Sequence, residues 1–131
     1  MNYKIGLKYS KSFLIDDTAI NQFAIASQDN NPVHLDDNFA KNTIFKQRIA
    51  HGMLLGGLIS SILGNDFPGN GTIYLNQQMS FRKPVFINDT VEVIIEIQEI
   101  TEKGWLSLST NCFVNQILVM EGSALVIPPK K

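Results

Sequence analysis

The chain has 131 residues, which at about 100 to 200 residues per domain predicts a single domain over residues 1–131. Apolar residues make up 44% and charged residues 18%, so the chain is expected to fold around a core, and its sparse charge indicates an interface between copies, most simply a homodimer. The net charge of −1, without any long basic stripe, argues against a nucleic-acid partner.

The N-terminal part of the chain predicts edge strands and a helix, with no targeting segment. Residues 3–14 fit one or two edge strands. The charges within residues 1–22 leave no apolar signal segment, so a cytoplasmic location is expected. Residues 16–18 offer an N-cap for a helix that must end before Asn31, because Pro32 disfavours helical backbone in the residue before it.

A helix over residues 52–64 is apolar almost all round, as expected of a helix enclosed by other elements. Its most apolar part, residues 53–63, is well short of the roughly 20 residues that span a bilayer, so no membrane partner is expected. Small residues recur on it at every fourth position: Gly52, Gly56, Ser60 and Gly64. Such a stripe indicates either close packing of the helix on a strand or a substrate channel along the helix.

From residue 72 onward the period of the sequence changes to the alternation of β-strands. Residues 73–81 predict a strand with one buried face, and further strands are expected at 91–97, 105–114 and 117–127, in an antiparallel meander. The single cysteine, Cys112, is expected in the core of a strand and excludes a disulfide within the chain. Because the chain has one cysteine and only two histidines, neither a metal site nor any other cofactor is expected.

The densest cluster of polar chemistry lies between the first helix and the helix at residues 52–64. Asp29 and His34 are five residues apart across a proline turn, so both side chains can reach one water molecule. A histidine titrates near neutral pH and a carboxylate can order its ring, so the pair is a candidate general acid and base. The alternative is structural, with Asp29 capping a turn and His34 packing beneath it.

The start of the apolar helix offers a second candidate feature. The N–H of Gly52 is a first-turn donor without an intrahelical partner, at the positive end of the helix dipole. It could therefore stabilise negative charge on a thioester oxygen, although a glycine there could equally well just permit the helix entry. His51, beside it, is interpreted as a helix-start residue, with a second catalytic group as the alternative.

The run Phe23 to Ala40, FAIASQDNNPVHLDDNFA, resembles the hydratase motif of the MaoC-like (R)-specific enoyl-CoA hydratases. The segments RIAHGMLLGGLISSILG and PGNGTIYLNQQMSFRKPV and the turn at residues 88–91 are similar to the same family, so the resemblance covers nearly the whole chain. One departure is Gln28, at a position where the family commonly has glycine.

The resemblance implies an α+β hot dog fold, an antiparallel sheet wrapped around a long central helix, and pairing as a homodimer. It implies that Asp29 and His34 hold the water that adds to an acyl-CoA thioester substrate, while Gly52 N–H polarises the thioester oxygen. Ser60 matches a serine that lines the family's site. Three further residues are expected to bind substrate: Asn31 from the motif, Gly56 from the stripe, and Leu63, at the far end of the stripe, which would stop the acyl chain.

The implied reaction is a reversible syn addition of water to trans-2-enoyl-CoA, with CoA as part of the substrate and no separate cofactor. Three other functions fit the same chain: a dehydratase acting on 3-hydroxyacyl groups carried by acyl carrier protein, a hot dog thioesterase, and a non-catalytic acyl-CoA-binding subunit. The Asn31 to His34 segment has no evident task in hydrolysis, and a binding module needs no paired acid and base.

Overall fold

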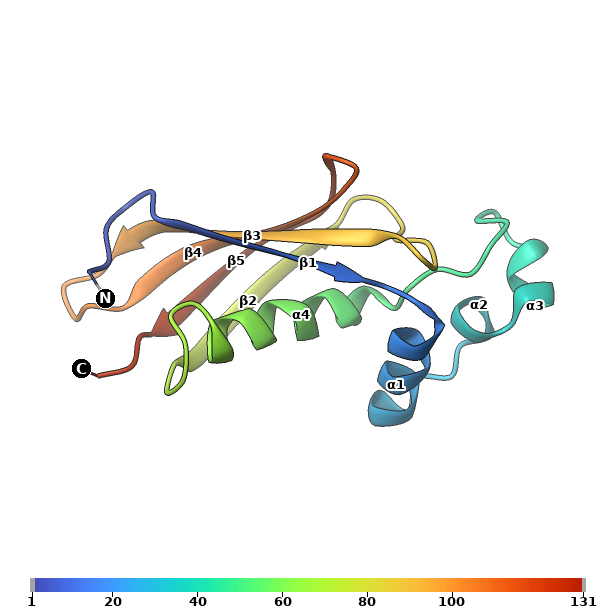
Figure 1. Cartoon of the computed structure of the whole chain (residues 1–131), viewed down its shortest axis with the longest axis horizontal. Helices are drawn as coiled ribbons and strands as arrows, with labels where there is room; N and C mark the ends of the chain where they lie inside the picture. Colours follow the sequence, from blue (N-terminus) through green and yellow to red (C-terminus); the bar gives the residue numbers. More distant parts are fainter. Residues whose placement is uncertain (1, 131) are drawn as a thin grey trace.

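The computed structural model describes residues 2–130, and its main feature is a five-stranded antiparallel sheet that curves over one long helix (Figure 1). Along the chain the elements are β1 (Lys8–Leu14), α1 (Asp17–Ser27), α2 (Pro32–Leu35), α3 (Asp37–Lys41), α4 (Gly52–Asn65), β2 (Ile73–Phe81), β3 (Thr90–Ile100), β4 (Leu106–Val114) and β5 (Ile117–Ile127). The strand order β1-β3-β4-β5-β2 places β1 and β2 at the two edges of the sheet.

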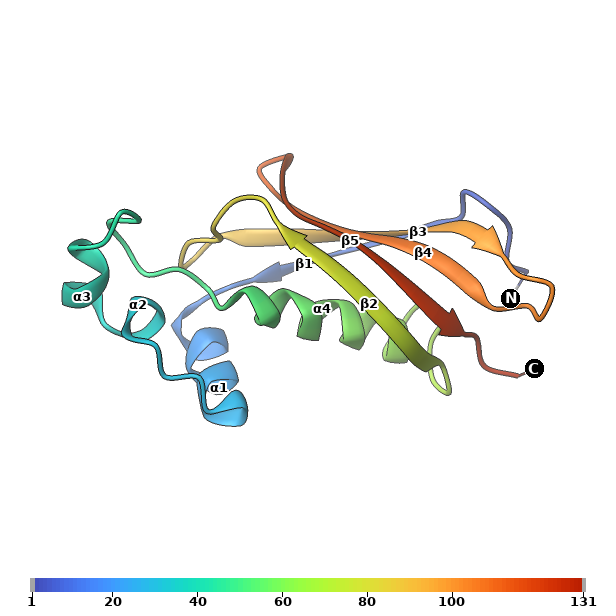
Figure 2. The ribbon, with the colours of Figure 1, turned by 180° about the vertical axis from the view of Figure 1, so that it is seen from behind.

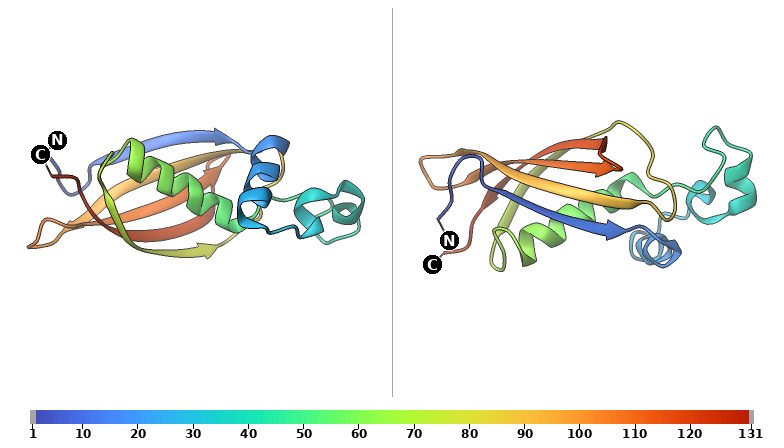
Figure 3. Two further views of the ribbon diagram at one scale, coloured as in Figure 1. Left: turned by 90° about the horizontal axis from the view of Figure 1, so that it is seen from below. Right: turned by 45° about the horizontal axis from the view of Figure 1, so that its top comes forward.

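The core lies between α4 and the concave face of the sheet (Figure 3). On β3 the predicted alternation is confirmed, since Val91, Val93, Ile95 and Ile97 are all fully buried while the residues between them are partly exposed. Cys112 is buried in β4, as expected. Burial raises the pKa of its thiol to about 12, which is consistent with a packing role.

The strand β2 does not have the buried face that its alternation predicts. Ile73, Leu75 and Phe81 remain exposed, and only Gln77 and Met79 are partly buried. The strand pairs with β5 alone, and a bulge near Asn76 interrupts its register. Because β2 lies at the edge of the sheet, next to β5 (Figure 2), the core does not reach most of its side chains.

The three short helices gather beyond the N-terminal end of α4 (Figure 1). The Asp16 side chain accepts a hydrogen bond from Ala19 N–H and caps α1, and α1 ends before Asn31 as predicted. The proline turn expected after Asn31 is in fact a one-turn helix, α2, with Pro32 as its first residue. No helix within residues 2–130 combines the length and apolarity needed to cross a membrane.

Candidate functional site

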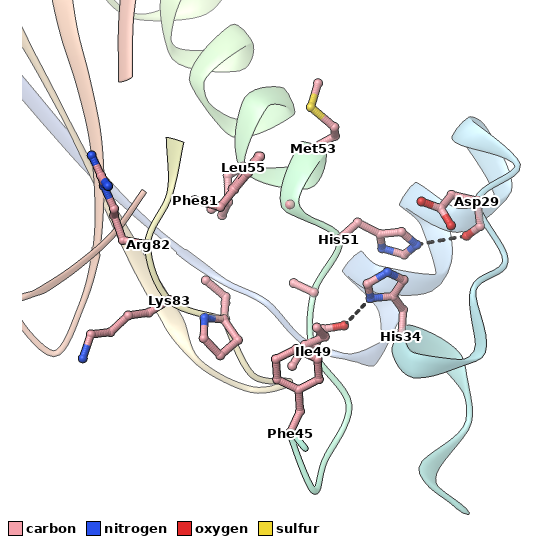
Figure 4. A pocket seen from close by; sticks show the side chains of 14 residues that line it. Asp29, His34, Phe45, Ile49, His51, Met53, Leu55, Phe81, Arg82 and Lys83 are labelled. Atoms are coloured by element: carbon pink, nitrogen blue, oxygen red, sulfur yellow. Dashed lines mark hydrogen bonds between the residues drawn. The ribbon is translucent and has the colours of Figure 1, made fainter. Parts of the chain in front are cut away.

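A cavity of about 530 Å³ opens at the N-terminal end of α4, where the short helices meet the turn after β2 (Figure 4). Its walls come from four parts of the chain: the α1–α2 connection, α2, residues 45–55, and residues 81–85. Asp29, His34 and Gly52, which the sequence predicts to act together, all line it. The structure therefore brings the proposed acid–base pair and the proposed oxyanion donor to one space.

His34 lies in α2 with its ring buried against the segment that leads into α4. Its Nδ1 is 2.8 Å from the carbonyl oxygen of Ile49, and because a carbonyl only accepts, the ring proton belongs on Nδ1. In the neutral ring, Nε2 is then the bare nitrogen. Burial lowers the pKa of His34, and the charge of His51 lowers it further, against opposing effects of the Ile49 bond and Asp29. His34 is therefore a neutral proton acceptor near pH 7.

Asp29 sits in the exposed connection between α1 and α2 with its carboxylate facing the cavity (Figure 4). One carboxylate oxygen accepts the N–H of Asn31 at 3.3 Å, and the Asp29 N–H donates to the Ser27 hydroxyl at 3.2 Å. The turn-capping role considered as an alternative is thus present. It leaves the carboxylate accessible, however, so capping and proton transfer are compatible at this residue.

His51 lines the same cavity, although the sequence favours a helix-start residue over a second catalytic group. It is the N-cap residue of α4, it is 1% exposed, and its ring stacks on that of His34 with 3.9 Å between ring centroids. Its Nε2 lies 3.0 Å from the backbone oxygen of Asp29. The partners are far from it in sequence, so no local spacing could have indicated these contacts.

Arg48 is a second residue that sequence reasoning missed. Its Nε donates to the backbone oxygen of His34 at 2.7 Å, and its guanidinium forms an ion pair with Asp17 at 2.7 Å. The arginine side chain is buried while the aspartate is largely exposed. Arg48 thereby ties α2 to the start of α1 and holds the backbone that carries His34.

Gly52 is the first residue of α4, so its N–H has no partner within the helix, and the His51 side chain does not cap it. A Cβ at this position would lie only 2.9 Å from Cε1 of Phe81, on β2. The glycine therefore allows an aromatic ring of the cavity wall to approach the helix start. Its N–H remains a candidate donor to a ligand in the cavity.

The remaining predicted substrate-binding residues lie outside this cavity. Asn31 caps α2, with its side-chain oxygen accepting the N–H of Val33 at 3.2 Å. Gly56 lines a second cavity of about 350 Å³, and Met53 is a wall of both cavities. Ser60 is exposed on α4, and Leu63 is buried in the core.

The stripe of small residues on α4 meets different surroundings along its length. A Cβ on Gly52 would come too close to Phe81, whereas a Cβ on Gly56 would lie 3.4 Å from Cε of Met79, an ordinary van der Waals contact, and a Cβ on Gly64 would meet nothing within 4 Å. Close packing on β2 therefore accounts for Gly52 and not for Gly56 or Gly64.

Asp29, His34 and His51 each bring one potential metal-ligating atom within 4.8 Å of the other two. One nitrogen of each ring is already bonded to a backbone carbonyl oxygen, however. Stacked rings also direct their remaining nitrogens side by side, and tetrahedral metal sites need ligands that converge on one point. The cluster is better suited to moving a proton than to holding a metal ion.

Comparison with known proteins identifies the family of the chain. Residues 4–110 match the model of the MaoC like domain, and the chain belongs to that family. An (R)-specific enoyl-CoA hydratase from Rhodospirillum rubrum is 41% identical over 129 residues, which cover 98% of this chain and 90% of the relative. A 3-hydroxybutyryl-CoA dehydratase from Methylorubrum extorquens is 42% identical, with coverage of 98% and 82%.

The fold comparison is equally close. The structure of an R-hydratase from Pseudomonas aeruginosa in its unliganded form superposes with a TM-score of 0.95 at 38% identity, covering 98% of this chain and 84% of that one. The sheet and α4 therefore form a hot dog fold, which confirms the expectation drawn from the sequence resemblance.

Proposed function

We propose that this protein is an (R)-specific enoyl-CoA hydratase, which adds water reversibly and syn to trans-2-enoyl-CoA and yields (R)-3-hydroxyacyl-CoA. The observation that carries the proposal is the meeting of the Asp29 carboxylate, the bare Nε2 of His34 and the N–H of Gly52 in one cavity. Two proton acceptors and an oxyanion donor are the groups that such an addition requires.

In the proposed reaction, a water molecule donates one hydrogen to Asp29 and the other to Nε2 of His34. Its oxygen forms a bond to C3, and Asp29 takes the proton released from the water. Negative charge develops on the thioester oxygen, where the N–H of Gly52 and the positive end of α4 stabilise it. The proton then passes to C2 on the same face, so the atoms of one water molecule are added and the site returns to its starting state.

This assignment gives Asp29 the role of base and His34 the role of water orienter. It follows from the hydrogen bond to Ile49 and the lowered pKa of His34, because a neutral ring with bare Nε2 accepts a hydrogen bond and cannot donate one from that nitrogen. The reaction transfers protons and no electrons, so we propose that it needs neither cofactor nor metal.

An acyl-CoA thioester is the substrate class we propose, with Arg82 and Lys83 at the cavity available to the CoA phosphates. Arg82 is already paired with Glu121 at 3.2 Å. The same two cations could serve an acyl carrier protein, so the two carriers must be compared directly. A cytoplasmic location stays a prediction, which fractionation of cells would test.

We also propose that the protein is a homodimer joined along β2. The outer edge of β2 pairs with no strand within residues 2–130, and its side chains Ile73, Leu75 and Phe81 are exposed. Met53, on the adjacent part of α4, is 58% exposed. An apolar surface that continues from an open strand edge onto a helix is the kind of surface that a second copy covers.

The test is to incubate the protein with crotonyl-CoA, follow the loss of enoyl absorbance, and determine the chirality of the product. Formation of (R)-3-hydroxybutyryl-CoA is expected. Release of free CoA would instead identify a thioesterase, and binding without turnover would identify an acyl-CoA-binding subunit. A kcat/KM higher on the acyl carrier protein thioester than on the CoA thioester would identify the carrier-protein dehydratase.

A further inference from the structure

His51 has no step to perform in the proposed reaction, yet it is a polar side chain buried at the centre of the site. The residue is 1% exposed, and its Nδ1 has no hydrogen-bond partner among residues 2–130. Burying a polar ring with an unsatisfied nitrogen costs free energy, so its other contacts must compensate. Those contacts are with Asp29 and His34, the acid–base pair, and with the ring of Phe23.

The hydrogen bond from His51 Nε2 to the Asp29 backbone oxygen joins parts of the chain that are distant in sequence. The remaining hydrogen bonds of Asp29 go to Ser27 and Asn31, both within two residues, so they shape the turn without placing it in the molecule. The contact with His51 is therefore what fixes the exposed turn against the start of α4.

The ring of His51 also holds the ring of His34. It contacts two rings, with His34 stacked on it at 3.9 Å and Phe23 of α1 packed at a tilt at 4.9 Å between centroids. His34 is thus fixed by the Ile49 oxygen in the plane of its ring and by His51 across its face (Figure 4).

We propose that His51 is a positioning residue that sets the Asp29 carboxylate relative to Nε2 of His34, acting through its Nε2 proton and its stacked ring. The inference rests on the proposed hydratase function, because the pair matters only if the two groups share a water molecule. A misplacement of about 1 Å between such groups can lower a rate by roughly 100-fold.

The charged and titratable groups around these rings are few. Asp29 comes from the α1–α2 connection, and Arg48, paired with Asp17 of α1, bonds the backbone of α2. Arg82 and Lys83 line the cavity from the β2 side. His51 itself contributes to the lowered pKa of His34, so its removal is expected to raise that pKa.

Two substitutions test the hydrogen-bond donor and the aromatic ring of His51 separately. His51→Gln keeps an N–H donor at the reach of Nε2 and loses the ring, whereas His51→Phe keeps a flat ring and loses the donor. We expect His51→Phe to lower kcat on crotonyl-CoA by about 10- to 100-fold with KM changed less than about threefold, and His51→Gln to lower kcat by a smaller factor, because it keeps the donor and loses only the stacked ring. In both variants the acidic limb of kcat/KM should move to higher pH.

Nuclear magnetic resonance gives a readout that does not depend on turnover. In the unmodified protein, ring nitrogen shifts should show that His51 carries a proton on Nε2. In both variants the titration midpoint of His34 should rise. A proton on Nδ1 alone, an unchanged His34 midpoint, or full kcat in folded His51→Phe would each overturn the inference.

The outcomes also separate this inference from the proposed function. If the unmodified protein does not hydrate crotonyl-CoA, the function fails, and the resonance measurements still decide whether His51 orders Asp29 and His34. If His51→Phe does not fold, His51→Gln and the tautomer of the unmodified protein decide. Equal losses of kcat in both variants, with the His34 midpoint unmoved, would indicate packing alone.

Discussion

The two hydrogen bonds that end on Ile49 and Asp29 determine which ring nitrogens remain free in this site. His34 uses Nδ1 and His51 uses Nε2, each on a backbone oxygen. The bare Nε2 of His34 is left to accept a hydrogen bond from the water that we propose is shared with Asp29. Backbone geometry therefore assigns the roles of the two imidazoles, which residue type alone does not distinguish.

Removing either member of the acid–base pair should affect the rate far more than folding. Asp29→Asn and His34→Ala are each expected to lower kcat by at least about 100-fold, the usual scale for a positioned acid or base. Steady-state kinetics with crotonyl-CoA, beside thermal unfolding of the same samples, would measure this. If the variants instead lose stability while their folded fraction keeps normal activity, both residues are only structural.

The lowered pKa of His34 predicts how activity depends on pH. Because the neutral ring is the active form, kcat/KM should fall at acidic pH with a midpoint below the ordinary histidine value of about 6.5. A midpoint above 6.5, measured over pH 5 to 8, would contradict this.

The same shift links His34 to stability. The unfolded chain binds a proton more readily than the folded chain, so this contribution is complete above about pH 6.5 and is lost as the pH falls through that value toward the lower folded pKa. In His34→Gln, the unfolding free energy should lose that part of its pH dependence.

Gln28 is the position where the sequence departs from the glycine common in the family, and the structure gives a physical reason for that glycine. Gln28 ends α1 with φ of +63°, a left-handed conformation that favours glycine. Gln28→Gly is expected to stabilise the fold by about 0.5 to 1 kcal/mol, because steric strain is relieved at some cost in chain entropy. Denaturant unfolding would measure it, and a destabilised variant would show that Gln28 makes compensating contacts.

At the scale of elements, sequence periodicity predicts the buried face of a strand inside the sheet better than that of a strand at its edge. The alternation along β3 matched its burial because β1 and β4 flank that strand and the core lies beneath it. The equally clear alternation along β2 failed, because its edge position depends on the order of strands, which no local pattern contains.

The candidate site, too, could be predicted from local sequence only in part. Asp29, His34 and Gly52 were predictable because a compact motif and a helix start contain them. His51 and Arg48 were missed because their partners come from distant segments and the contacts go to backbone oxygens, which any residue provides. The short helix α2 was read as a turn because Pro32 both ends one helix and begins another.

Two routes along helix α4 are hypotheses for the acyl chain, one toward Leu63 and one past Gly56. Leu63 is buried in the core, whereas Gly56 lines the second cavity together with Met79. Leu63→Ala is expected to raise activity on octenoyl-CoA relative to crotonyl-CoA, at a stability cost of about 2 to 5 kcal/mol. An unchanged chain-length profile in the folded variant would remove the route toward Leu63.

Gly56→Leu tests the other route. The added side chain would meet Met79 and fill the second cavity, so activity on both substrates should fall if the acyl chain passes there. Normal kinetics on octenoyl-CoA would show that the second cavity is not part of the acyl site.

At the scale of the whole molecule, the open edge of β2 predicts a dimer. Light scattering at micromolar concentration is expected to give twice the mass of 14.6 kDa. Leu75→Lys, placed on the exposed part of β2, should shift the protein toward the monomer, because it brings a charge into the apolar surface. The outward-facing Ser109→Lys on β4 is a matched control that should leave the mass unchanged. A monomer in the unmodified protein would contradict the assembly.

If the proposed dimer forms, the exposed edge of β2 makes the stability of this protein depend on its own concentration. If folded chains associate along that edge, mass action adds to the free energy of unfolding as the concentration rises, and the melting temperature rises with it. On dilution, each separated chain presents unpaired backbone N–H and C=O groups next to Ile73 and Leu75. Such an edge is a template for indiscriminate strand pairing, so the separated chain would be more prone to non-specific association with other strands than the dimer.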